Sequence, residues 1–232
     1  MAITVKRLNA ALGAEVSGLD ITKELNADTI SALHSAWHEH LVLVFRNQSL
    51  TPAQHIRFSQ WFGELDDHAA IPKFRHPDYP QILMVNNKEV ATNKKLSVGR
   101  QWHSDLSTTL QPAKASLLHA VQLPSVGGDT MFCNMYRAWD GLSGLLQSWL
   151  EKVDALHDMT LARETRKQRS PAELQEILLR NPQVYQPVCR RHDVTGRKAL
   201  YVSEMTTSQI EGLTIEESEP LLEYLFAQST QH

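Results

Sequence analysis

The sequence has 232 residues, of which 42% are hydrophobic and 21% are charged, and its formal net charge at pH 7 is −3. These values indicate a globular protein with a sizeable core. The lack of a basic stripe, and a longest tight apolar run of only residues 41–45, argue against nucleic-acid and membrane partners. Two cysteines, Cys133 and Cys189, are too few for a disulfide framework and predict free thiols in a cytoplasmic protein.

The N-terminal part of the chain is predicted to combine short strands with two helices. Residues 1–20 fit short strands that are joined at glycines. A helix is expected over residues 28–40, and a fully buried strand follows at 41–45. A second helix is expected over 51–63, because its second residue is a proline, which suits a first helical turn.

Short β-like runs dominate the remaining sequence. They are residues 82–85, 101–106, 115–121, 129–133, 153–157, 184–188 and 199–202. Helices are expected between them, at 139–150, 171–179 and 215–227. Many short strands without regular βαβ alternation favour a mainly β antiparallel barrel or jelly roll with helical insertions. No repeat or composition break divides the chain, so residues 1–232 are interpreted as one domain.

The tripeptide His103-Ser104-Asp105 lies in one of these predicted strands. Residues i and i+2 of a strand point to the same face, so an imidazole and a carboxylate would converge. An iron(II) oxygenase uses two histidines and one carboxylate as ligands, and this pair would supply two of the three. The alternative interpretation is structural, with Asp105 satisfying amides of the following turn and His103 serving as a hydrogen-bonded core histidine.

The sequence around this tripeptide carries a longer pattern. The segment Trp102-His103-Ser104-Asp105 is followed by Leu-Pro-Ser-Val-Gly-Gly-Asp-Thr at residues 123–130. Together with further segments in the same order along the chain, this pattern resembles the taurine and 2,4-dichlorophenoxyacetate dioxygenase (TauD/TfdA) family. The further segments are residues 13–20, 41–46, 62–65 and 196–201. The resemblance implies an iron(II)/2-oxoglutarate oxygenase with a double-stranded β-helix (jelly-roll) fold.

The resemblance assigns roles to four residues. His103 and Asp105 match the first two iron ligands. Thr130 matches a position whose hydroxyl binds a carboxylate of 2-oxoglutarate, although it would equally suit a strand as a β-branched residue. His68 matches a substrate-contacting histidine of the taurine-type members, and the alternative is a histidine on an exposed loop.

Some features of the family pattern are different or missing. Ile71 stands where taurine-type members have a tyrosine and Gly99 where they have an amide, which argues against taurine itself as the substrate. Phe132 and Cys133 favour the phenoxyalkanoate branch. The family's third iron ligand, a distal histidine, and its 2-oxoglutarate-binding arginine have no match in this sequence. We therefore expect that the last barrel strands are missing and that the functional protein is longer.

The resemblance predicts an enzyme that uses Fe(2+), 2-oxoglutarate and O2. Its expected reaction hydroxylates a small organic anion, such as a sulfonate, a sulfate ester or an aryloxyalkanoate, and decarboxylates 2-oxoglutarate to succinate. A homo-oligomer, either a dimer or a tetramer, is expected. Two alternatives remain open: a non-catalytic jelly-roll protein that binds a ligand in the same pocket, and a cupin-like metalloenzyme with zinc or manganese.

Overall fold

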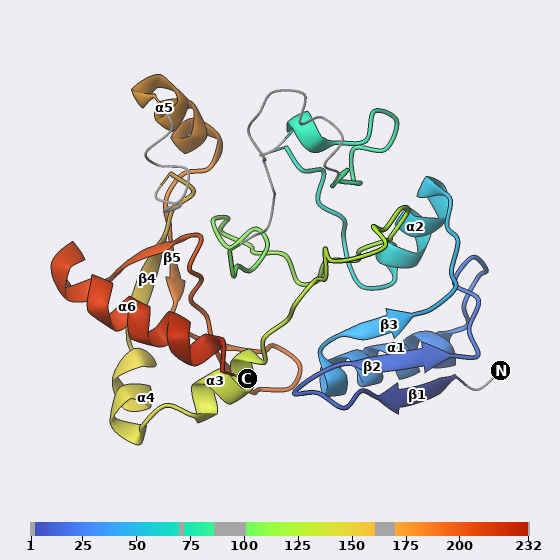
Figure 1. Ribbon diagram of the computed structural model, residues 1–232, viewed down its shortest axis with the longest axis horizontal. Coiled ribbons are helices and arrows are strands. Elements are labelled where there is room, and N and C mark those ends of the chain that lie inside the picture. The colour runs from blue at the N-terminus through green and yellow to red at the C-terminus, as the bar shows by residue number, and fades with distance from the viewer. Residues whose placement is uncertain (1–2, 70–71, 86–100, 161–169, 232) are drawn as a thin grey trace. The chain divides into compact units, whose positions relative to one another are not determined.

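The computed structural model describes residues 3–69, 72–85, 101–160 and 170–231 (Figure 1). The chain forms two compact units. Unit 1 comprises residues 1–85 and 114–134, and unit 2 comprises residues 86–113 and 135–232. None of the described helices is long and apolar enough to cross a membrane. Two positions that bear on the substrate prediction, Ile71 and Gly99, lie outside the described residues.

Unit 1 contains a three-stranded sheet with a helix against it (Figure 1). The central strand β2 (Ala14–Ser17) pairs with β1 (Thr4–Arg7) in antiparallel and with β3 (Leu43–Phe45) in parallel orientation. Helix α1 (Ala27–His40) connects β2 to β3 and contacts β3. The predicted strand at 41–45 is therefore shorter than expected, and its side chains are half-buried instead of fully buried.

Local capping signals define the helices of unit 1. Asn26 precedes α1, and its side chain accepts a hydrogen bond from the Thr29 amide, so the helix begins before the predicted residue 28. Helix α2 (Pro52–Gln60) begins as predicted, because Thr51 and Gln54 form a reciprocal capping box. A short 3₁₀ helix, η1, covers Pro72–Phe74. The core of the unit is formed by Val16, Ile21, Leu33 and Phe58, with partly buried apolar residues around them.

The predicted strands at 82–85, 115–121 and 129–133 are not strands in the structure. The first makes only an isolated bridge, between Leu83 and Arg75. Strands require a neighbour that exchanges ladder hydrogen bonds, and no described strand pairs with 115–133. Part of this segment is nevertheless attached to its unit, since Leu117 packs against the core and its carbonyl accepts a hydrogen bond from His55 Nε2 at 3.1 Å.

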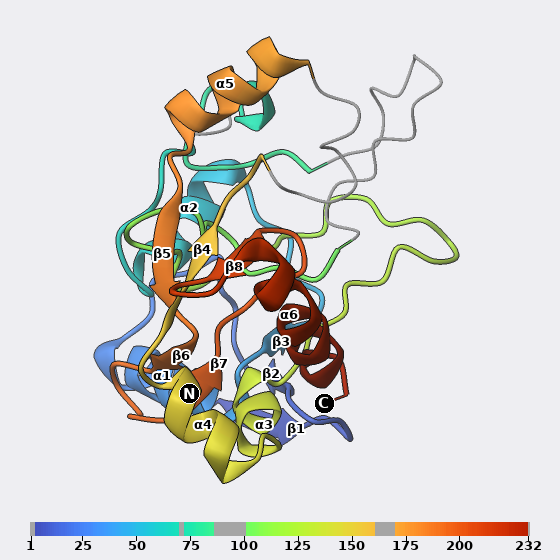
Figure 2. The same cartoon turned by 90° about the vertical axis from the view of Figure 1, so that its left-hand side faces the viewer.

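Unit 2 contains a second three-stranded sheet and a hairpin (Figure 2). Strand β4 (Asp154–His157) lies between β5 (Val184–Pro187) and β8 (Thr207–Ile210) and is antiparallel to both. Strands β6 (Cys189–Arg191) and β7 (Lys198–Leu200) form the hairpin. The sequence predicted β4, β5 and β7 but neither β6 nor β8.

Four helices accompany these strands. Two of them, α5 (Pro171–Arg180) and α6 (Ile215–Ser229), lie where the sequence predicts them. The predicted helix at 139–150 is instead two helices, α3 (Met135–Asp140) and α4 (Gly144–Leu150), because Ser143 caps a new helix. Helix α6 packs against β8, and α3 packs against β7. The core between these elements includes fully buried leucines and isoleucine, namely Leu150, Leu200, Ile210 and Leu225.

Candidate metal centre

Residues 102–109, hereafter the ligand segment, do not form the predicted strand. The chain makes a turn at 105–108, with Leu106 at a φ of 53° and the Thr109 amide donating to the Leu106 carbonyl at 3.0 Å. The predicted strand at 101–106 is therefore wrong. The structure nevertheless places the two side chains side by side, His103 just before the turn and Asp105 at its start.

His103 and Asp105 lie in contact. Nε2 of His103 is 3.3 Å from Oδ1 of Asp105, and the side chains are 27% and 54% exposed. Nδ1 of His103 lies 2.8 Å from the carbonyl of Gln101, which only accepts, so this nitrogen carries the proton. Nε2 is then the atom directed at Asp105. The Asp105 carboxylate raises the pKa of His103 above its ordinary value, against an opposing effect of partial burial.

This pair has the chemistry and spacing of two metal ligands. Two atoms bound at right angles to one ion, each at about 2.1 Å, lie about 3 Å apart, close to the observed separation. A carbonyl that accepts from the opposite ring nitrogen is the usual way to fix the tautomer of a ligating histidine. The exposure of both side chains leaves room for further ligands. Among the described residues, no group of three or more His, Cys, Asp or Glu side chains is placed to hold a metal ion.

A buried polar layer lies beneath the ligand segment, and sequence reasoning missed it. Tyr201 follows β7; its hydroxyl interacts with the side chain of Ser104, the residue between the two ligands, and burial raises its pKa. The guanidinium of Arg190 lies 4.9 Å above the Tyr201 ring, and the imidazole of His157 stacks on the same ring at 5.7 Å. These contacts join residues that are 11, 44 and 97 positions apart, and no local sequence motif indicates them.

His157, at the end of β4, belongs to this layer and is only 1% exposed. Its Nδ1 lies 3.4 Å from the Thr206 hydroxyl and its Nε2 lies 3.3 Å from the Thr207 hydroxyl. Burial lowers the pKa of His157 to about 4, and the nearby positive charge of Arg190 acts in the same direction. His157 is therefore neutral at pH 7 and serves as a hydrogen-bonding group.

Thr130 and His68 belong to unit 1, whereas His103 and Asp105 belong to unit 2, and each is described within its own unit. Thr130 is exposed in an irregular part of the chain. His68 lies on a loop with a φ of 55°, and its Nε2 donates to the Gln81 carbonyl at 3.1 Å. The side chain of His68 is only 18% exposed, so it is more buried than the alternative of a surface loop histidine suggests.

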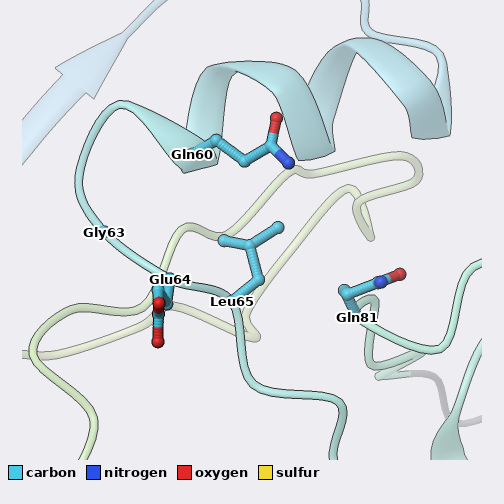
Figure 3. Close-up of a pocket in the computed structure, with 5 residues that line it drawn as sticks. All are labelled: Gln60, Gly63, Glu64, Leu65 and Gln81. Atoms are coloured by element: carbon cyan, nitrogen blue, oxygen red, sulfur yellow. The ribbon is translucent and has the colours of Figure 1, made fainter.

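An open cavity of about 550 Å³ lies in unit 1. Figure 3 shows its lining residues, which come from the end of α2, the following loop and a separate turn: Gln60, Gly63, Glu64, Leu65 and Gln81. The lining mixes amide, carboxylate and apolar groups. His68 is not one of the lining residues, but its ring donates a hydrogen bond to the carbonyl of Gln81, which is.

Known proteins resemble this chain along nearly all of its length. The profile of the taurine catabolism dioxygenase TauD, TfdA family matches residues 4–232. The α-ketoglutarate-dependent 2,4-dichlorophenoxyacetate dioxygenase of Cupriavidus pinatubonensis is 31% identical, over all of this chain and 83% of its own length. The structure of a taurine dioxygenase from Burkholderia xenovorans matches 99% of this chain and 73% of its own, with a TM-score of 0.79 and 32% identity. The structure of AAD-2 with Mn(II) and N-oxalylglycine matches the whole chain and 81% of its own, with a TM-score of 0.72 and 26% identity.

Proposed function

Because this chain belongs to the taurine catabolism dioxygenase (TauD, TfdA) family, we propose that it is an iron(II)- and 2-oxoglutarate-dependent dioxygenase that hydroxylates a small organic anion. The observation that carries the proposal for the site is the contact between His103 Nε2 and Asp105 Oδ1, within the family's Trp-His-X-Asp motif. When bound, iron(II) with 2-oxoglutarate and O2 supplies the oxidising power, releasing succinate and carbon dioxide.

The residues of the chain bind and orient the reactants. His103 would hold the metal through Nε2, while Nδ1 stays protonated on the Gln101 carbonyl, and Asp105 would hold it through a carboxylate oxygen. The Thr130 hydroxyl would donate to a carboxylate of 2-oxoglutarate. His68 would contact the substrate beside the cavity of unit 1. The sequence offers no matched residue for the family's distal histidine or arginine.

The substrate class follows from the relatives. One named relative acts on 2,4-dichlorophenoxyacetate, and one solved neighbour is a taurine dioxygenase. Both named compounds are small organic acids, which supports an anionic substrate of the sulfonate, sulfate ester or aryloxyalkanoate class. A screen of such compounds for succinate release would identify the substrate.

We also propose the domain organisation, the cellular location and the oligomeric state of the protein. We assign residues 1–232 to a single oxygenase domain with a double-stranded β-helix (jelly-roll) core, supported by the structural match to the taurine dioxygenase. A cytoplasmic location is supported by two cysteines that are both free thiols. A homodimer or homotetramer completes the proposal, and light scattering on the purified protein would measure it.

The decisive test removes each ligand of the pair. His103→Ala and Asp105→Ala should each weaken Mn(II) binding by more than about 100-fold, because they remove a ligand and not merely its support. Both should also remove the weak visible absorption of the anaerobic iron(II)/2-oxoglutarate complex and the release of succinate in air. Asp193→Ala, at an exposed aspartate of the β6–β7 turn, is the matched control and should change none of these signals.

The outcome separates the rival interpretations. A wild-type protein that binds 2-oxoglutarate but shows no absorption band and no succinate would be a ligand-binding protein. A protein that binds zinc or manganese through the same pair and ignores 2-oxoglutarate would be a cupin-like metalloenzyme. Either result would overturn the dioxygenase proposal.

A further inference from the structure

The far end of the ligand segment is attached to the protein by one buried amide side chain. Gln186 on β5 is 5% exposed, and its Nε2 donates to the carbonyl of Thr109 at 2.7 Å and to that of Ser107 at 3.3 Å. Its Oε1 accepts from Arg190 at 3.3 Å. A guanidinium only donates and a carbonyl only accepts, so the orientation of this amide is fixed chemically.

A buried hydroxyl cluster attaches the same segment at two further points. The Thr206 hydroxyl lies 2.9 Å from that of Ser107 and 3.0 Å from that of Ser203. Ser203 donates to the carbonyl of Trp102 at 3.4 Å, and the Met205 amide donates to the same carbonyl at 3.3 Å. With the Ser203 proton used in this way, Thr206 donates to Ser203 and accepts from Ser107.

These attachments bracket the two ligands. One lies at Trp102, immediately before His103, and the others lie at Ser107 and Thr109, just after Asp105. The segment between them has no strand ladder, so these hydrogen bonds, together with the contact between Ser104 and Tyr201, hold its conformation. The ligands themselves are exposed, whereas Ser107 and the groups that hold it are buried, and buried hydrogen bonds are costly to break.

We propose that Gln186 and Thr206 are positioning residues, which hold the ligand segment in the conformation that keeps His103 and Asp105 together. The link to metal binding rests on the proposed function. Residues that orient metal ligands from behind commonly change metal affinity by about 10- to 100-fold when they are altered. Neither residue touches the metal or substrate; both act through the backbone of the segment.

Amide hydrogen exchange tests the positioning role without any metal. Gln186→Leu should make the amides of residues 102–109 exchange roughly tenfold faster, since two carbonyls lose their donor. Gln228→Leu is the matched control, because Gln228 is 7% exposed in the same unit and donates to Ala138, away from the ligand segment. It should leave exchange in 102–109 unchanged. Equal exchange in 102–109 for the two variants would overturn the proposal.

Variants of Thr206 provide a second test of the positioning role. Thr206→Val keeps the volume and removes the hydroxyl, whereas Thr206→Ser keeps the hydroxyl. Mn(II) titration followed by electron paramagnetic resonance should show about tenfold weaker binding for Thr206→Val and near wild-type binding for Thr206→Ser. The reverse order would show that Thr206 matters only for packing and would overturn its role. A wild-type protein without Mn(II) affinity would defeat the proposed function, while hydrogen exchange would still decide the positioning role.

Discussion

The ligand segment and residues 115–132, hereafter the outer segment, were both predicted to contain strands, and neither does, yet they differ in what holds them. The ligand segment has buried residues on its inner side, with Ser107 at 1% and Thr108 at 5% exposure. The outer segment, which carries Thr130, exposes apolar side chains instead, including Val121 at 87% and Val126 at 89%. An irregular segment can therefore be well fixed where buried polar groups replace the ladder.

The comparison also separates the predicted site residues by the strength of their structural support. His103 and Asp105 are in direct contact above a buried hydrogen-bonded layer. Thr130 matches the family motif for 2-oxoglutarate binding, but its side chain is exposed within unit 1. Substitutions at buried residues of unit 2 should therefore have larger effects than substitutions in the outer segment.

Shortening a core leucine of unit 2 should cost the most stability. Leu200 is fully buried and directly precedes Tyr201, so Leu200→Ala should lower the free energy of unfolding by about 2–5 kcal/mol. Leu123→Ala in the outer segment is the matched control and should change it by less than about 0.5 kcal/mol, because Leu123 is 73% exposed. Denaturant unfolding measures both. Equal losses would mean that the outer segment is covered by other parts of the protein.

The buried His157 should make stability depend on pH. Its pKa is about 4 in the folded protein and near its ordinary value when unfolded, so between these values only the unfolded chain binds the proton. The contribution of His157 to stability is therefore constant above about pH 6.5 and falls as the pH decreases towards 4, by about 3 kcal/mol in total. Tyr201, whose ring stacks on that of His157, does not change charge in this window, because burial raises its pKa further.

A variant isolates this contribution from other titrating groups. His157→Gln retains hydrogen-bonding capacity but does not titrate, so its stability should decrease less between pH 6.5 and 4 than that of the wild type. The difference in slope should approach about 1.4 kcal/mol per pH unit, the value for one proton. Parallel curves for the two proteins would mean that His157 is protonated in the folded state.

The sequence predicted those elements whose signals are local. Helix α2 begins at Pro52 after Thr51, and α5 begins at Pro171 after Ser170, and in both cases a capping box fixes the start. Strands β4 and β5 were predicted from their apolar runs. The break between α3 and α4 was missed, although Gly141 and Ser143 are residues that commonly interrupt helices.

The positioning residues of the candidate site could not be predicted from local signals. Gln186 and Thr206 meet Ser107 across 79 and 99 residues of sequence, and a polar residue in a strand gives no sign of a distant partner. The spacing of His103 and Asp105 was informative about their proximity but not about the backbone, since the two side chains lie in contact although residues 102–109 form no strand. The pair of candidate metal ligands was therefore easier to predict from the sequence than the backbone conformation that holds them.

The smallest effect is expected at Thr130, where the structure gives the least support. If its hydroxyl donates to a carboxylate of 2-oxoglutarate, Thr130→Val should weaken binding of 2-oxoglutarate to the Mn(II)-loaded protein by about tenfold, the lower range for a hydrogen bond to a charged group. Thr130→Ser should bind nearly as well as wild type, and Ser125→Ala, at an exposed neighbour, should have no effect. Isothermal titration calorimetry measures all three. Wild-type affinity in Thr130→Val would favour the structural interpretation of Thr130 as a β-branched residue, and the contrast between the two segments would then extend to function.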